Sequence, residues 1–366
     1  MKIGILTYHR SHNYGAILQA IALREYLISK GHEVYFVDYW PEYHKAMYNI
    51  IDRYSLKKFS LKNKLKYLLK TLLILSRKQK RRKEFFKFIN AKIAPYIKPY
   101  DSSFKFDAIL YGSDQIWRKQ GGLNHKFNPV YFGENILNTA KHIAFSASMG
   151  MINLNEDDKI FLKSHLEKFD KIAVRETDLE YALSSLDIPN VGVTVDPTLL
   201  LSKKNWEELF NLKRIIEEPY ILYYNLLGNS FDLDKVREYA KLKGKRLIII
   251  EGHIHNNFTN KDTREYDNPE KFLSLIKHAE IVLTSSYHGM MFSIIFQKQF
   301  YVAFDQNGGR AQSILSQLGL EKRILSPKSN IPVEGKNIDY KTCENINNVL
   351  IERSKEFLNN NLIVTR

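Results

Sequence analysis

The feature that most constrains the fold of this chain is an alternation of short apolar runs with longer stretches of helical periodicity. A strand followed by a helix and then another strand forms a parallel βα unit. The pattern breaks at Asp196-Pro197 and then starts again. We therefore predict an α/β protein with two doubly wound, Rossmann-like domains facing a cleft, where ligands bind at the carboxyl ends of strands. The expected strands are residues 2–6, 33–37, 108–110, 142–145, 171–174 and 191–193, then 220–224, 246–250, 281–283 and 300–303.

These patterns predict the domain limits. The first domain covers residues 1–194, with a basic helical insertion at 55–92, and the second covers residues 195–340. A final helix is expected within residues 341–366. A chain of 366 residues with 44% apolar content is long enough for two buried cores.

Positive charge is concentrated in one segment. The whole chain carries a formal charge of +15, and between Lys57 and Lys92 there are 14 Lys or Arg against one acidic residue, Glu84. Leucine and phenylalanine recur there at steps of three and four, which predicts basic amphipathic helices. Two interpretations stay open: helices with one buried stripe and a solvated face, or a docking surface for anionic membrane lipid. No nucleic-acid motif accompanies the charge, so nucleic acid is not expected as a partner.

Targeting signals are not evident. The longest apolar run, residues 67–75, is interrupted by Lys70 and falls far short of the ~20 residues that a spanning helix needs. Cys343 is the only cysteine, and it cannot form an intramolecular disulfide. These observations predict a cytoplasmic protein, with a peripheral position at the inner face of the membrane if the basic segment docks there.

The densest cluster of unusual residues runs from Thr284 to Phe292, between an apolar run and an amphipathic stretch. A strand that ends in Thr and Ser and continues as a helix places small hydroxyls and the imidazole of His288 at a helix N-terminus. Backbone N–H groups attract an anion at such a position.

This cluster, Ser-Ser-Tyr-His-Gly, and four other segments resemble the polysaccharide pyruvyl transferase family in the same order along the chain. The other matches are Lys2–Thr7 with Asn13–Gln19, Gly112–Trp117, Phe145–Gly150, and Val174–Glu176 with Val195–Leu201. Single motifs of this kind arise by chance, but an ordered set over residues 1–325 does not.

The resemblance implies a fold like that of the GT-B glycosyltransferases, with the last helix packing back across the first domain. It implies a transferase that uses phosphoenolpyruvate as co-substrate, without a cofactor, to form a pyruvate ketal on a sugar of a cell-surface polysaccharide precursor, such as an exopolysaccharide or capsule unit. The acceptor is expected to be a glycan, and a lipid-linked one.

The reaction that the resemblance implies needs an acid/base group with a pKa near neutrality and cations for the donor's anionic groups. His288 is the predicted acid/base; its alternative role is a capping or core histidine. Arg175 is the predicted anion-binding cation; its alternative is an ion pair with Glu176 or Asp178.

The donor side departs from the commonest family pattern at Ser286, which stands where many members have an arginine. Arg310, at the start of a predicted helix, is the candidate for the missing charge; its alternative is a solvent-facing arginine. The hydroxyls of Ser285 and Ser286 and the amides of Tyr287 to Gly289 are predicted to bind phosphate oxygens.

The acceptor side is predicted from strand ends of the first domain. Carboxylates, amides and a stacked aromatic ring hold sugar hydroxyls, and Asp114, Asn13 and Trp117 offer one of each. Their alternatives are a turn, an N-cap and a core aromatic, and an N-cap is also open for Asp114. The full predicted acceptor set is Asn13, Tyr14, Gly15, Ser113, Asp114 and Trp117.

No metal site is predicted, because His9 with His12 and His253 with His255 lack companion ligands. Two other functions stay open. One is a nucleotide-sugar glycosyltransferase of the same architecture, although no acidic residue follows a strand to hold a ribose. The other is a non-catalytic sugar-binding relative, in view of Ser286.

Overall fold

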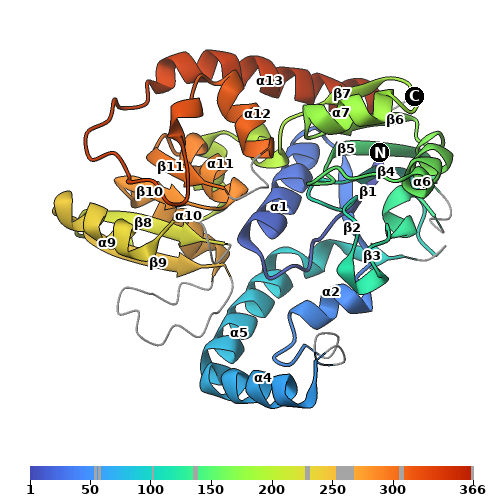
Figure 1. Ribbon diagram of the computed structural model, residues 1–366. Helices are drawn as coiled ribbons and strands as arrows, with labels where there is room; N and C mark the ends of the chain where they lie inside the picture. Colours follow the sequence, from blue (N-terminus) through green and yellow to red (C-terminus); the bar gives the residue numbers. More distant parts are fainter. Residues whose placement is uncertain are drawn as a thin grey trace.

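The computed structural model describes residues 1–52, 56, 59–100, 103–134, 139–226, 231–252, 268–304 and 309–363. Two parallel sheets form two α/β domains (Figure 1). In the first sheet the order is β3-β2-β1-β4-β5-β6-β7, and in the second it is β12-β11-β10-β8-β9. This is the two-domain, Rossmann-like architecture that the alternating pattern predicts, and it has the GT-B-like arrangement of two sheets.

The strands lie close to their predicted positions, because each is a short apolar run bounded by polar residues. Three predicted strands have the same limits in the structure, and most of the others extend by one to four residues. In the first sheet the strands are β1 (Lys2–Leu6), β2 (Glu33–Asp38), β3 (Ile97–Pro99), β4 (Phe106–Tyr111), β5 (Thr139–Ala147), β6 (Lys171–Val174) and β7 (Val191–Val193). In the second they are β8 (Tyr220–Asn225), β9 (Arg246–Glu251), β10 (Ile281–Thr284), β11 (Gln299–Ala303) and β12 (Ile324–Leu325).

Helix α1 (Tyr14–Ser29) lies between the two domains (Figure 1). Almost all of its residues from Tyr14 to Leu27 are buried, which is typical of a helix that is covered on every side. Tyr14 stacks on Phe272 of α10 (Pro269–His278), with ring centroids 4.5 Å apart. Helix α1 is therefore part of the contact that holds the domains together.

The remaining helices fall into two groups along the chain. In the first domain and its insertion they are α2 (Glu42–Met47), α4 (Leu61–Leu73), α5 (Leu75–Lys92), α6 (Glu156–Leu166) and α7 (Thr177–Ser184). In the second they are α8 (Lys203–Leu209), α9 (Leu233–Leu242), α10, α11 (Tyr287–Ile295) and α12 (Gly309–Gln317). Helix α8 begins at Lys203, because Ser202 and Asn205 form a capping box.

The last helix, α13 (Tyr340–Asn361), runs back over the first domain (Figure 1). Ser354 Oγ accepts a hydrogen bond from the backbone N–H of Val195 at 3.0 Å, and Asn359 Oδ1 accepts one from Tyr26 at 3.2 Å. Cys343 is buried. Helix α13 thus bridges the two halves of the chain.

Helices α4 and α5 form the basic insertion and extend away from both sheets (Figure 1). Helix α5 buries Phe85, Phe88 and Ile89, as a helix with one buried stripe should. Helix α4 does not: its only buried residue is Thr71, and its leucines face outward. The expectation of a buried apolar stripe is therefore wrong for α4.

Candidate active site

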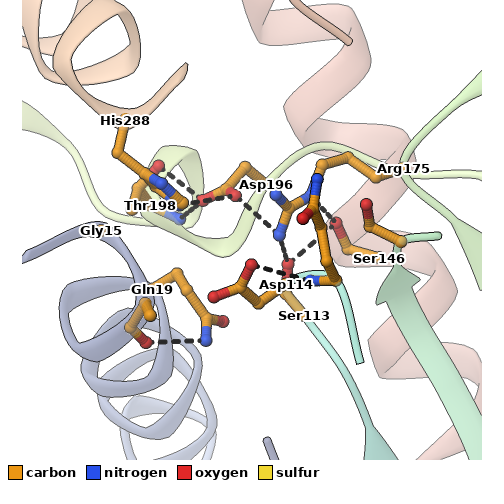
Figure 2. Close-up of polar contacts among 12 residues, drawn as sticks. Gly15, Gln19, Ser113, Asp114, Ser146, Arg175, Asp196, Thr198 and His288 are labelled. Carbon is orange, nitrogen blue, oxygen red and sulfur yellow. Dashed lines mark hydrogen bonds and ion pairs between the residues drawn. The ribbon is translucent and has the colours of Figure 1, made fainter. Parts of the chain in front are cut away.

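The site lies where the switch points of the two sheets face each other. Chain order reverses between β1 and β4 in the first sheet and between β8 and β10 in the second. In open parallel sheets, ligands bind in the crevice beyond the carboxyl ends of the strands at such points. The loops after β1, β4, β6 and β7 and the start of α11 meet there, and Figure 2 shows the side chains that they bring together.

Asp196 is the centre of this cluster. Its side chain is completely buried, and its Oδ2 lies 3.0 Å from Arg175 Nη2 and 3.3 Å from His288 Nε2. Its Oδ1 accepts hydrogen bonds from the backbone N–H and the hydroxyl of Thr198, at 2.9 and 2.7 Å. Burial alone would raise the pKa of Asp196, but Arg175 and His288 outweigh it and hold the pKa well below its usual range.

Arg175, directly after β6, is held in a cage of polar and aromatic groups. Its Nη2 donates to Ser113 Oγ, its Nε donates to Ser146 Oγ at 3.4 Å, and its guanidinium lies 5.3 Å from the centre of the Tyr287 ring. Burial alone would lower the pKa of Arg175, but the Asp196 carboxylate overcomes this and raises it. Its Nη1 is buried and has no hydrogen-bond partner among the described residues.

The position of the His288 side chain depends on Gly15, a glycine of the other domain. A Cβ added at Gly15 would stand 2.0 Å from His288 Nδ1 and 2.7 Å from His288 Cβ, so no side chain fits at position 15. The His288 side chain is 10% exposed, with its Nε2 against Asp196. The first turn of α1 and the first turn of α11 thus meet at Gly15 and His288 (Figure 2).

The loop after β4 and the end of β5 carry backbone strain. Asp114 has φ 75° and Ser146 has φ 51°, the left-handed region that non-glycine residues rarely adopt. Strain of this kind persists only where the surroundings enforce it, and it gathers at functional sites. A hydrogen-bond chain helps to enforce it here: Gln19 donates to Thr7 Oγ1 at 3.0 Å, and Thr7 donates to the carbonyl of Ser113 at 2.9 Å.

The structure brings together four residues predicted from the sequence: His288, Arg175, Gly15 and Ser113. Among the residues that the structure describes, Arg175 forms its ion pair with Asp196, and not with the predicted alternatives Glu176 and Asp178. Asp114 lies at the same strand ends, where its Oδ1 accepts the N–H of Gln115 at 2.7 Å.

Three residues of the predicted acceptor set take part in capping or packing within the protein. Asn13 is the N-cap of α1 and accepts from the backbone N–H groups of Gly15 and Ala16. Tyr14 is completely buried at the domain contact. Trp117 is also completely buried and donates from Nε1 to the carbonyl of Tyr131 at 2.9 Å. An enclosed ring cannot stack on a sugar, so the stacking role predicted for Trp117 is wrong in this conformation, and Trp117 is a core aromatic.

At the start of α11, the two serines predicted to bind phosphate make hydrogen bonds within the protein. Ser286 caps the helix by accepting from Gly289 N–H at 3.3 Å, and Ser285 Oγ accepts from Leu226 N–H at 3.0 Å. Both serines are 2% exposed. A phosphate cradle of the predicted form would have to displace these bonds, so Ser285, Ser286 and Gly289 serve the fold in this structure. The neighbouring Tyr287 instead faces Arg175.

Sequence reasoning missed Asp196, Thr198 and Gln19 as site residues. Asp196-Pro197 marks a break in the sequence pattern, but it also follows the strand at 191–193 and lies within a family motif. Its place directly beyond a strand end was the available signal. The backbone of Arg310 lies in the first turn of α12, and its side chain lies outside the part of the chain that the structure describes.

A cavity of about 310 Å³ adjoins the cluster between the two domains and α13. Arg175, Asp196, Tyr287 and Arg353 are among the residues that line it. His253 and His255 lie outside the described residues. Among the residues that are described, no group of three His, Cys, Asp or Glu side chains is arranged to hold a metal ion.

Comparison with known proteins decides the family. Residues 13–305 match the family model of the polysaccharide pyruvyl transferases. The chain belongs to this family. The match contains the strand ends that carry Gly15, Arg175, Asp196 and His288, so the buried cluster lies within the family's own region.

Other proteins are similar to this pyruvyl transferase family member at lower identity or over a smaller part of their length. A probable polyketide synthase of Dictyostelium discoideum is 26% identical over 42% of this chain, and the matched part is 5% of that protein's length. The UDP-GlcNAc 2-epimerase of Methanocaldococcus jannaschii is 12% identical over 96% of this chain and 93% of its own, with a TM-score of 0.47. The Rickettsia bellii enzyme of the same name is 11% identical over 99% and 98%, with a TM-score of 0.45.

In the described parts of the chain, every helix is either too short or too polar to cross a bilayer.

Proposed function

We propose that this protein transfers the pyruvyl group of phosphoenolpyruvate to two hydroxyls of one sugar, forming a cyclic ketal and releasing phosphate. The observation that carries the proposal is the single buried network of Arg175, Asp196 and His288. It combines an acid/base imidazole anchored by a carboxylate with a guanidinium that keeps one N–H donor unpartnered. Because the chain belongs to the polysaccharide pyruvyl transferase family, we assign pyruvyl transfer to this network.

In this mechanism His288 moves the proton. Its Nε2 faces Asp196, which leaves Nδ1 as the nitrogen that gives a proton to the methylene carbon of the donor. That carbon becomes the methyl group, and positive charge develops at the central carbon. The first sugar hydroxyl attacks the central carbon, and its proton returns to Nδ1. Asp196 orients the ring through Nε2, as a buried carboxylate does for a catalytic histidine.

The second sugar hydroxyl then attacks the same carbon and displaces the phosphate, which leaves with the second proton. Arg175 binds the donor's carboxylate through Nη1, the donor atom for which the described residues supply no partner. The adjoining cavity, which Arg353 also lines, has a size typical of small-molecule sites. We further propose that the acceptor is a lipid-linked glycan.

The test is an incubation of the purified protein with phosphoenolpyruvate and a glycoside that has two free neighbouring hydroxyls. We expect phosphate release only when the glycoside is present, and a product whose mass exceeds that of the glycoside by pyruvate less one water. His288→Gln should lower kcat by about 10² to 10⁴, the usual worth of a general acid/base, while the exposed His125→Gln should not. Sugar transfer from a nucleotide sugar, with phosphoenolpyruvate untouched, would contradict the proposal and favour a glycosyltransferase.

A further inference from the structure

Helix α4 presents its leucines to solvent. A water-soluble helix normally turns its apolar stripe toward the core. Here the residues directed at the rest of the protein are Thr71, which is 5% exposed, and the half-buried Tyr67. The exposed residues are Leu61 (85%), Leu65 (61%), Leu68 (38%), Leu69 (54%), Leu72 (64%) and Leu73 (64%).

These leucines form one continuous face. Leu61, Leu65, Leu68 and Leu72 follow the three- and four-residue spacing that places side chains above one another on a helix. Helix α4 lies at the end of the insertion farthest from both sheets (Figure 1). The leucine face, defined as the six exposed leucines of α4, therefore projects from the body of the protein.

Positive charge borders this face. Lys62, Lys66 and Lys70 are exposed and follow one edge of the leucine face, and α5 adds further exposed Lys and Arg side chains. Between residues 59 and 92 the sequence has 12 Lys or Arg and only Glu84 as an acidic residue. An apolar face bordered by lysines is typical of helices that lie in the headgroup region of a bilayer, with the charged ends reaching toward the lipid phosphates.

We propose that α4 docks this protein on an anionic membrane by inserting the leucine face among the lipids, with the bordering cations against acidic headgroups. A second copy of the chain is a poorer occupant, because two insertions face to face would bring together two strongly positive segments. A helix of 13 residues also offers a small contact, whereas stable interfaces bury roughly 1,200–2,000 Å².

The insertion is tied to the second domain close to the candidate site. Arg81 of α5 donates to the carbonyls of Glu251 and Gly252, at 3.1 and 2.9 Å. Arg77 lies 3.4 Å from the Glu251 carboxylate. Docking through α4 would therefore hold the interdomain cleft in a set orientation to the membrane. The proposal concerns binding alone and does not depend on the reaction proposed above.

The experiment is co-flotation of the full chain with vesicles of phosphatidylglycerol and phosphatidylcholine in equal parts, against vesicles of phosphatidylcholine alone. We expect binding to the anionic vesicles that weakens with salt. The combined variant Leu65→Asn, Leu69→Asn and Leu72→Asn keeps every charge and should bind at least about 100-fold more weakly. Lys62→Gln, Lys66→Gln and Lys70→Gln together should cost roughly 100-fold.

Matched controls exist on other surfaces. Leu242→Asn removes a leucine that is 61% exposed on α9, and Lys241→Gln, Lys322→Gln and Lys336→Gln remove three exposed charges. Neither control should change vesicle binding. Because Cys343 is buried and is the only cysteine, a Leu72→Cys variant can be labelled selectively with a polarity-sensitive dye. Its emission should shift to the blue on anionic vesicles.

Three results would overturn the proposal. Wild-type protein that does not float with anionic vesicles would exclude docking. Leucine variants that bind as well as wild type, with no dye shift, would exclude insertion. Dimers that form without lipid and that the leucine variants abolish would make a second copy the occupant of the leucine face.

Discussion

The contact between Gly15 and His288 allows a sharp test of the site. A methyl group at position 15 would stand 2.0 Å from His288 Nδ1 and 2.7 Å from His288 Cβ. Rotation of the imidazole can relieve the first contact but not the second, because Cβ is fixed to the backbone. Carbon atoms prefer separations of about 3.5–4.0 Å, so Gly15→Ala must displace the start of α11 from α1 by about 1 Å.

The expected cost follows from this displacement. Forcing an extra methyl group into a packed contact destabilises a protein by about 1–3 kcal/mol. A catalytic group misplaced by about 1 Å can lose roughly 100-fold in rate. Gly15→Ala should therefore lower the free energy of unfolding by about 1–3 kcal/mol and kcat by roughly 100-fold. The measurements are urea unfolding and phosphate release from phosphoenolpyruvate in the presence of a glycoside.

The matched control is Gly121→Ala, because a Cβ at Gly121 would meet nothing within 4 Å. That variant should retain both stability and activity. If Gly15→Ala matched the Gly121→Ala protein in both measurements, the contact between the first turns of α1 and α11 would not determine the position of His288. The reasoning from geometry to catalysis would then be refuted.

Two further predictions concern buried ionisable groups. Asp196→Asn leaves the Arg175 charge buried without its partner and should cost about 3–5 kcal/mol of unfolding free energy. Because the pKa of Asp196 is lowered in the folded protein, its carboxylate stabilises the fold above a pH of about 4, and this stabilisation is lost on further acidification. In urea unfolding at several pH values, Asp196→Asn should therefore lose less unfolding free energy below pH 4 than the wild-type protein does. Burial lowers the pKa of His44 from 6.5 to about 4, so its neutral form favours folding above pH 6.5 and this contribution is lost as the pH falls to 4. His44→Gln should make the unfolding midpoint less dependent on pH over that interval, and an unchanged slope would assign the dependence to other groups.

The strands were predictable because their signal is local. A run such as residues 172–174 is apolar and is bounded by the charged residues Lys171 and Arg175, and this is enough to place β6 within the chain. The parallel arrangement follows from the alternation with helices, and the carboxyl-end rule then indicates Arg175 and His288 as site residues. Motif order added the family, which the match over residues 13–305 confirms.

The roles of individual side chains at those strand ends were less predictable. Ser286 and Trp117 follow strands as a ligand-binding residue would, yet the first caps α11 and the second packs in a core. Whether a polar or aromatic side chain faces a ligand or the protein depends on neighbours far away in the sequence. The carbonyl that accepts from Trp117 belongs to Tyr131, 14 residues away.

Local pattern was therefore sufficient for the βα units, the two domains and the strand ends where chemistry can occur. Tertiary structure alone decided that Asp196 pairs with both Arg175 and His288, because loops from distant strands must converge before one carboxylate can satisfy two partners. It alone decided that the leucines of α4 face outward while Phe85 and Phe88 of α5 face inward. Periodicity shows that a helix has an apolar face, but only the packing of the whole chain determines what covers that face.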